Sequence, residues 1–325
     1  MATRLVFHGA NAASFSDGFG ALVGDAVAVA VLPDALETDA DRAAFAEAEI
    51  IIGNWLDASL PRPERLRLFH LPAAGYDRVD FATLPPGAVV CNCFGHEAAI
   101  AEYVMAALLQ RAVPLADADR RLRQGDWAYW AGAPERTHPE IAGTTVGLLG
   151  FGHIGKAVAR RAKAFDMRVH VANRSAVPAS GLVDRYFPLD RLAEFWGSAD
   201  SLVVTVPLAP ETQGIVGRGA FAAMRRGAVL VNVARGPVVD EQALYDALRE
   251  GRIGGAVIDT WYRYPTPQQP HGAPSDLPFH TLPNLVMTPH MSGWTTGTIR
   301  RRQQAMAENI CRRLRGEACV NVVSP

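Results

Sequence analysis

Cysteine is scarce in this chain, with four residues among 325. So few cysteines exclude a disulfide scaffold in a chain of this length. Cys91 and Cys93 are separated by one residue, a spacing typical of no common zinc site, and Cys311 and Cys319 lie far away in the sequence. The histidines show no metal-site spacing with one another or with the cysteines. We therefore predict reduced thiols, a cytoplasmic protein and no metal site.

Long apolar runs and a surplus of charge are also absent. No stretch approaches the roughly 18 consecutive apolar residues of a membrane span. The N-terminal MATRLVFHGA lacks the apolar region of a signal peptide. The formal net charge is −1 and the arginines are spread along the chain, so nothing attracts phosphodiesters or anionic lipids globally. We expect neither a nucleic-acid partner nor a membrane partner.

What the chain does contain is apolar sequence arranged in short alternating runs. Hydrophobic residues make up 49% of it, and its length favours two domains over one. Strand-like runs alternate with helical ones over residues 4–94, and again over residues 144–290. Such alternation predicts an α/β fold with two Rossmann-like, doubly wound parallel sheets. One long helix is expected over residues 97–125, and a last helix over about 297–315 with no strand after it.

A glycine-rich loop opens the second series. The stretch TTVGLLGFGHIGKAVARRAKAF places Gly150, Gly152 and Gly155 in G-x-G-x-x-G spacing between a strand and a helix. In a dinucleotide site the first glycine permits a tight turn, the second lets the pyrophosphate approach, and the third lets helix and strand pack closely. The helix N-terminus then presents free N–H groups to the phosphates. His153 is expected beside the pyrophosphate, or else it simply begins the helix.

The end of the next strand bears on which dinucleotide is bound. NAD sites usually carry an acidic residue there, which binds the ribose hydroxyls and repels a 2′-phosphate. This chain instead has Asn173, Arg174 and Ser175. A guanidinium beside a hydroxyl favours NADP, because arginine binds phosphate through a charge-assisted fork. The alternative is that Arg174 stacks on the adenine or points to solvent, with NAD as a possible cofactor.

Two residues at strand ends carry the chemistry. Arg235 follows the apolar run AVLVNVA, and His290 follows LVMTP. Open parallel sheets bind ligands at the carboxyl ends of their strands. An arginine can hold a carboxylate through two hydrogen bonds, and a histidine can exchange a proton with an oxygen near neutral pH. Hydride transfer between a nicotinamide and a 2-oxo or 2-hydroxy acid requires such a pair.

With these motifs in place, the chain resembles the D-isomer-specific 2-hydroxyacid dehydrogenase family, which includes glyoxylate/hydroxypyruvate reductases. The match covers nearly the whole length through LPAAGYDRVD, AAIAEYVMAALL, GLLGFGHIG, TVPLAPETQGIVG, VNVARGPVVDEQAL, AVIDTWYRYP and TPHMSG. The resemblance implies a homodimer. It also implies a flavodoxin-like substrate-binding domain of residues 1–98 plus 296–325, an NAD(P)-binding Rossmann domain of residues 99–295, and a cleft between them.

The resemblance also assigns roles. Arg235 anchors the substrate carboxylate and polarises its carbonyl, and His290 is the acid in reduction and the base in oxidation. Backbone N–H groups of Ala74 and Gly75 bind the carboxylate, and Asp259 lies near the nicotinamide amide. The other cofactor-binding positions expected within the shared motifs are Ile154, Val206, Pro207, Thr212, Val233, Ala234 and Gly293.

Tyr264 departs from the family pattern. Most members carry a glutamate at this position, which hydrogen-bonds the catalytic histidine and raises its pKa. A tyrosine supplies no negative charge near neutral pH, although its hydroxyl can still orient His290 by accepting an N–H. Turnover in reduction should then fall at a lower pH than in glutamate-containing relatives, as His290 deprotonates. Glu97 is a candidate replacement carboxylate; otherwise it is a helix-start acid that interacts favourably with the helix dipole.

Three functions remain open for such a site. The first is a 2-oxoacid reductase in which Tyr264 orients His290. The second is a formate-type dehydrogenase, since family members that act on formate carry a neutral glutamine there and move no proton to an oxygen. The third is a catalytically weak dinucleotide-sensing regulator resembling the corepressor branch of the family.

Overall fold

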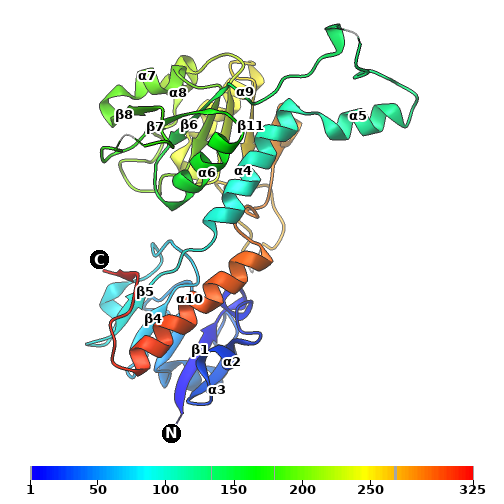
Figure 1. Ribbon diagram of the computed structural model, residues 1–325. Coiled ribbons are helices and arrows are strands. Elements are labelled where there is room, and N and C mark those ends of the chain that lie inside the picture. The colour runs from blue at the N-terminus through cyan, green and yellow to red at the C-terminus, as the bar shows by residue number, and fades with distance from the viewer. Residues whose placement is uncertain (1, 133, 179, 267–268, 325) are drawn as a thin grey trace. The chain divides into compact units, whose positions relative to one another are not determined.

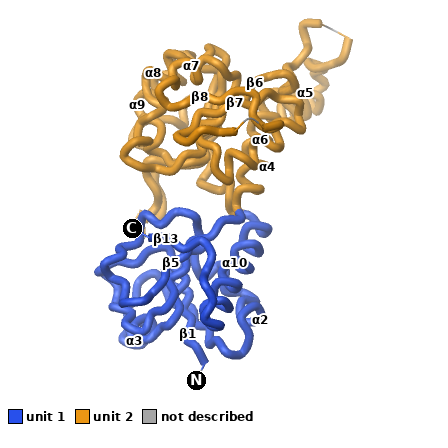
Figure 2. The backbone as a smooth tube through the Cα atoms, turned by 60° about the vertical axis from the view of Figure 1, so that its left-hand side comes forward, with its two compact units in different colours: residues 1–95, 295–325 blue, residues 96–294 orange. Residues whose placement is uncertain are grey.

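The computed structural model describes residues 2–132, 134–178, 180–266 and 269–324. The chain divides into two compact units, shown in two colours in Figure 2. Unit 1 comprises residues 1–95 and 295–325, and unit 2 comprises residues 96–294. The sequence placed the corresponding domain boundaries at 98/99 and 295/296. The N-terminal segment and the last helix thus share one unit, while the cleft expected between the units stays a prediction.

Unit 1 is built on a six-stranded sheet in the order β13-β5-β4-β3-β1-β2. Its strands are β1 (Thr3–His8), β2 (Val27–Leu32), β3 (Ile50–Gly53), β4 (Leu68–His70), β5 (Val89–Cys91) and β13 (Val322–Val323). The first five are parallel, and their order 2-1-3-4-5 is that of flavodoxin-like folds. In β1, Leu5 and Phe7 pack into one core and Val6 into the other, as the two-residue period of a strand requires. The helices are α1 (Ala10–Ala13), α2 (Phe19–Val23), α3 (Asp39–Ala46) and α10 (Thr296–Leu314).

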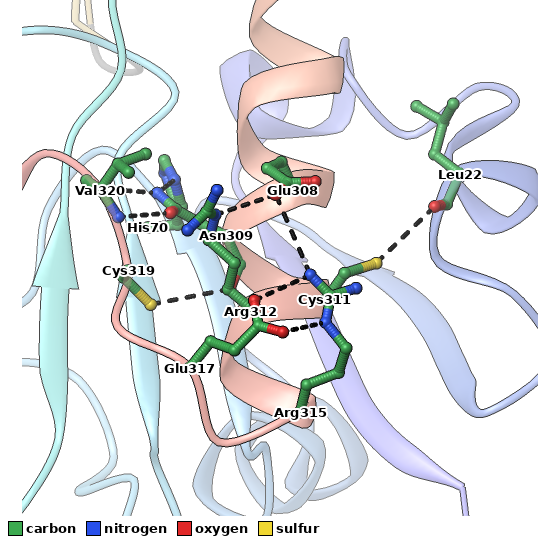
Figure 3. A network of polar contacts seen from close by, with 10 residues as sticks. All are labelled: Leu22, His70, Glu308, Asn309, Cys311, Arg312, Arg315, Glu317, Cys319 and Val320. Atoms are coloured by element: carbon green, nitrogen blue, oxygen red, sulfur yellow. Dashed lines mark hydrogen bonds and ion pairs between the residues drawn. The ribbon is translucent and has the colours of Figure 1, made fainter.

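The C-terminal segment is tied to unit 1 through α10 (Figure 3). The Asn309 side chain accepts from the Val320 N–H (2.8 Å) and donates to the Val320 carbonyl (2.9 Å) and to His70 Nε2 (3.0 Å). The expectation that no strand follows the last helix was wrong, because β13 pairs antiparallel with β5. Two residues are too few to show a strand period, so this pairing was invisible in the sequence.

Unit 2 carries a seven-stranded, wholly parallel sheet in the order β12-β11-β10-β9-β6-β7-β8. Its strands are β6 (Thr145–Leu149), β7 (Arg168–Ala172), β8 (Arg185–Phe187), β9 (Ser201–Val204), β10 (Val229–Asn232), β11 (Gly255–Ile258) and β12 (Leu285–Met287). The helices are α4 (Glu97–Ala112), α5 (Leu115–Leu122), α6 (His153–Ala164), α7 (Leu192–Gly197), α8 (Arg218–Ala223) and α9 (Glu241–Arg249). The order in which strands are added to the sheet reverses between β6 and β9, and open parallel sheets bind ligands beyond the carboxyl ends of the strands at such a point.

The single helix expected over residues 97–125 is in fact two, α4 and α5. Val113 has extended backbone angles and ends α4. The residue after it is Pro114, and proline lacks an N–H and disfavours a helical conformation of the residue before it. Figure 1 shows α5 reaching away from the sheet of unit 2. Within the described residues no single helix has the length and apolar content of a membrane span, although α4 and α5 together pass that test across a 47° bend.

Candidate active site

Three strands that are neighbours in the sheet of unit 2 deliver the candidate catalytic residues. Arg235 follows β10, Tyr264 follows β11 and His290 follows β12. The strands are parallel, so their carboxyl ends meet at one edge of the sheet. The structure thus brings together side chains that are separated by up to 55 positions in the sequence.

The turn that carries Arg235 is held close to the neighbouring strand end. Asn232 accepts from the Ala234 N–H (3.1 Å) and donates to the Arg235 carbonyl (3.1 Å). A Cβ atom on Gly236 would lie 2.3 Å from the Trp261 carbonyl oxygen, so glycine alone permits this approach. The Arg235 side chain is exposed, with Nη1 donating to the Ala234 carbonyl (2.8 Å).

Asp259 organises the loop that carries His290. His290 has a φ of 59°, in the left-handed region that residues other than glycine rarely adopt. The fully buried Asp259 carboxylate accepts from Thr288 Oγ1 (2.6 Å) and from the backbone N–H groups of Met291 and Ser292 (2.9 Å each). These bonds bracket His290 and hold its strained backbone in place. The expected neighbourhood of Asp259 and the nicotinamide amide stays a prediction.

The Tyr264 hydroxyl lies 2.9 Å from His290 Nδ1. It also accepts from the Trp261 backbone N–H (3.1 Å), and Trp261 Nε1 donates to the Thr288 carbonyl (2.8 Å). Tyr103, on α4, contacts Thr288 Oγ1 at 2.7 Å. Sequence reasoning missed Trp261, Thr288 and Tyr103. Thr288 and Tyr103 are 185 positions apart, and no local pattern indicates such a pair.

The surroundings of His290 and Tyr264 favour the neutral forms of both side chains. His290 keeps an exposed edge, yet the protein atoms around it lower its pKa by desolvation; the Arg235 cation lowers it further, and Asp259 partly opposes this. Burial raises the pKa of Tyr264, while the Trp261 N–H and Arg235 act to lower it and Asp259 to raise it. Near neutral pH we therefore expect an uncharged imidazole beside an uncharged phenol.

Glu97, the candidate replacement carboxylate, lies at the start of α4. Its Oε2 lies 3.7 Å from His96 Nδ1. In the described part of the chain, the His290 ring hydrogen-bonds to Tyr264 and to no carboxylate. The helix-start alternative for Glu97 agrees with this position better.

The glycine loop after β6 has the shape that a pyrophosphate requires. Gly150 has a φ of 99°, which permits the turn, and a Cβ on Gly155 would lie 2.5 Å from the Gly150 carbonyl oxygen. A Cβ on Gly152 would meet nothing within 4 Å, so its outer side is open to a ligand. Gly152 is also the N-cap of the twelve-residue helix α6, and the N-terminus of a helix favours the binding of phosphates. His153 is exposed as the first residue of α6.

The other expected cofactor positions line the same sheet edge. Asn173 accepts from the Phe151 N–H (3.3 Å) and donates to the Ser175 carbonyl (2.9 Å), which joins the glycine loop to the end of β7. The Arg174 side chain is exposed, with no hydrogen bond or ion pair to the described residues. Thr212 Oγ1 donates to the Pro207 carbonyl (2.6 Å) and accepts from the Ala209 N–H (2.8 Å). The remaining positions follow or flank strands or begin α6, namely Ile154, Val206, Val233, Ala234 and Gly293.

Ala74 and Gly75 belong to unit 1. Asn92 Nδ2 donates to the Ala74 carbonyl (2.6 Å) and the Cys93 N–H donates to the Ala73 carbonyl (3.1 Å), so the loop after β4 is held from β5. Among the described residues, neither the Ala74 nor the Gly75 N–H enters a backbone hydrogen bond. Both donors are available to a carboxylate.

A glycine loop at the reversal point of a parallel sheet, with an arginine and a histidine at the same edge, defines a nicotinamide-dinucleotide-dependent oxidoreductase. Residues 105–292 match the D-isomer specific 2-hydroxyacid dehydrogenase, NAD binding domain. The chain belongs to this family, and it is an oxidoreductase acting on 2-hydroxy acids. Its two α/β domains with parallel sheets confirm the predicted fold class.

Relatives match most of the chain. Glyoxylate reductase of Korarchaeum cryptofilum is 35% identical over 80% of this chain and 76% of its own length. Glyoxylate/hydroxypyruvate reductase B of Citrobacter koseri is 32% identical over 90% and 89%. A D-isomer specific 2-hydroxyacid dehydrogenase from Xanthobacter autotrophicus, solved with NADPH and MES, is 28% identical, with a TM-score of 0.79 over 100% of this chain and 99% of that one.

Proposed function

We propose that this protein is an NADPH-preferring reductase of small 2-oxo acids, which transfers hydride between nicotinamide C4 and the substrate C2. The observation that carries the proposal is the meeting of Arg235 and His290 at the sheet edge that also holds the glycine loop. Arg235 binds the carboxylate through its guanidinium fork, and His290 exchanges a proton with the C2 oxygen. Ala74 and Gly75 add backbone N–H donors for the carboxylate. The names of the relatives support glyoxylate and hydroxypyruvate as substrates.

The preference for NADPH rests on Arg174. Its exposed guanidinium follows β7 where an acidic residue would bind the ribose, and Ser175 stands next to it. Asn173 is occupied in bracing the glycine loop. The residue free to meet a 2′-phosphate is therefore the cation. NAD is expected to bind more weakly in the same place.

The partner that we propose is a second copy of the chain, docked through the segment around α5. This segment exposes the large apolar residues Leu115 (73%), Leu122 (50%), Trp127 (60%) and Trp130 (57%). Burying such residues against another copy would remove apolar area from water. Sedimentation of the Trp127→Ser, Trp130→Ser double variant should show monomers where the parent chain sediments as a dimer. A cytoplasmic location stays a prediction.

The test is NADPH oxidation, followed by absorbance at neutral pH against a panel of 2-oxo acids, with NADH in parallel and Arg235→Ala as control. Reduction that prefers NADPH and disappears in the control supports the proposal. If NADPH binds but no acid is reduced, 2-oxoacid reduction is excluded. The formate-type dehydrogenase and the dinucleotide-sensing regulator would then be tested next, because a neutral Tyr264–His290 pair suits reactions that move no proton to oxygen.

A further inference from the structure

The Tyr264 hydroxyl stands between one donor and one possible acceptor. It accepts from the Trp261 N–H at 3.1 Å and faces His290 Nδ1 at 2.9 Å. A phenol oxygen prefers one donated and one accepted hydrogen bond in the plane of its ring. With the accepted bond taken by Trp261, the hydroxyl proton points to His290. A histidine that accepts at Nδ1 carries its own proton at Nε2.

Three groups of described residues set the charge that this pair can bear. Arg235 disfavours a cation on His290 and favours an anion on Tyr264. Asp259 acts in the opposite sense, but its carboxylate already accepts three hydrogen bonds. The Trp261 N–H also favours a phenolate. Burial disfavours charge on either side chain, so both are neutral at rest, and Arg235 and the Trp261 N–H are the groups that stabilise a phenolate formed as the proton leaves.

A neutral imidazole cannot give up its Nε2 proton alone, because an imidazolate would remain. The proton has to be replaced at Nδ1 as it leaves Nε2. Tyr264 is the one group hydrogen-bonded to that atom in the described part of the chain.

We propose that Tyr264 is the proton donor of the reduction and that His290 relays its proton. The proposal rests on the proposed function. Bound NADPH supplies a hydride to C2, and the C=O π pair moves onto the oxygen. That oxygen takes the Nε2 proton of His290, while Nδ1 takes the hydroxyl proton of Tyr264 and the O–H bond pair stays on the phenolate. An alkoxide is a much stronger base than a phenolate, so the overall transfer is downhill.

Solvent restores the protonation state of Tyr264 and His290 after each turnover. The Tyr264 side chain is 48% exposed and His290 has an exposed edge. After the product leaves, Nε2 takes a proton from water or buffer and Nδ1 returns its proton to the phenolate. One proton from solvent is consumed per turnover, as the reduction of a 2-oxo acid requires. Tyr264 can donate its proton at every pH at which its hydroxyl is protonated. The proposal therefore differs from the expectation drawn from the sequence, in which turnover falls as His290 deprotonates.

The first test reads the tautomer and needs no substrate. The full chain is labelled with ¹⁵N-histidine, and its spectrum at pH 7.5, with and without NADPH, is compared with that of His290→Gln to assign the ring signals. The proposal expects a neutral His290 with its proton on Nε2 and an accepting Nδ1. A proton on Nδ1, or an imidazolium at this pH, overturns it.

The second test follows the pH dependence of 2-oxoacid reduction. The rate in the parent chain should stay level from about pH 6 to about pH 9 and fall only as tyrosine ionises, since free tyrosine has a pKa of about 10 and free histidine about 6.5. Replacing Tyr264 with 3,5-difluorotyrosine, a more acidic phenol, should move the alkaline limb down. A limb near the histidine value, or one that the fluorinated residue leaves in place, overturns the relay.

A variant and an isotope measurement separate the relay from simple positioning. Tyr264→Phe keeps the ring and removes the proton, so kcat should fall about 10²- to 10⁴-fold, the range of general acid catalysis. Rates in mixtures of H2O and D2O should curve with deuterium content in the parent chain, because two protons move together. A linear dependence, or an unchanged kcat in Tyr264→Phe, contradicts the proposal. If no 2-oxo acid is reduced at all, the proposed function fails, whereas the tautomer spectrum still decides whether Tyr264 donates to His290.

Discussion

The hydroxyl of Tyr264 lies 2.9 Å from Nδ1 of His290, held there by the Trp261 N–H. A carboxylate at this place would accept from the ring and favour imidazolium, whereas a phenol that donates to the ring favours neutral imidazole. With a carboxylate, the proton on Nδ1 belongs to the histidine before reduction, whereas in the proposed arrangement that proton belongs to the Tyr264 hydroxyl.

Placing a carboxylate beside His290 should raise the pKa of the histidine. In Tyr264→Glu the charged form of the ring gains an opposite charge within hydrogen-bonding range, so the ring keeps its proton to higher pH, by about 1 to 3 units. An NMR titration of ¹⁵N-labelled His290 measures this directly. The neutral variant Tyr264→Gln is the control and should move the pKa little. Equal titrations in the two variants would show that the new side chain does not reach the ring.

Two glycines of the nucleotide loop should respond differently to alanine. Gly155→Ala places a Cβ 2.5 Å from the Gly150 carbonyl oxygen and should lower the free energy of unfolding by about 1 to 3 kcal/mol, a typical overpacking cost. Gly152→Ala meets no protein atom within 4 Å, so its folding should be unchanged while its Kd for NADPH rises about tenfold or more. Urea denaturation and fluorescence titration separate the two effects. Normal NADPH affinity in Gly152→Ala would place the pyrophosphate elsewhere.

Arg174 should discriminate between the two dinucleotides. Removing a charge-assisted contact to the 2′-phosphate in Arg174→Ala should raise the Kd for NADPH about 10- to 100-fold and leave that for NADH nearly unchanged. Arg168→Ala, at the opposite end of β7, is the matched control and should alter neither value. Parallel loss of both affinities in Arg174→Ala would indicate that the side chain stacks on adenine.

His70 should make the stability of unit 1 depend on pH. Its burial lowers its pKa from about 6.5 to about 4, although its hydrogen bond to the Leu71 carbonyl acts in the opposite direction. Between these values the unfolded chain binds a proton that the folded chain refuses, so stability is full above about pH 6.5 and falls as the pH drops, by roughly 3 kcal/mol in all. Urea denaturation at pH 7.5 and 4.5 should show a smaller drop in His70→Gln than in the parent chain. Equal drops in both proteins would contradict the assignment to His70.

The sequence by itself determined the architecture and the inventory of the site. Alternating apolar runs and helical segments indicated two parallel sheets, because strand and helix periods are local properties of the chain. The glycine spacing after β6, and the positions of Arg235 and His290 after strands, placed these residues at a common sheet edge before any contact was known. The break at Pro114 was also readable from sequence, since proline disfavours a helical residue before it. The long-helix prediction overlooked this signal.

Only the tertiary structure decided how that inventory is connected. The pairing of β13 with β5 and the contact from Tyr103 through Thr288 to Asp259 join segments that lie far apart in the sequence. The direction of the Tyr264 hydrogen bond depends on a backbone N–H of Trp261 that no side-chain pattern reveals. Such contacts arise because folding places strand ends and a helix side by side. The chemistry of His290 follows from them, since hydrogen bonding and burial rather than residue type set its protonation.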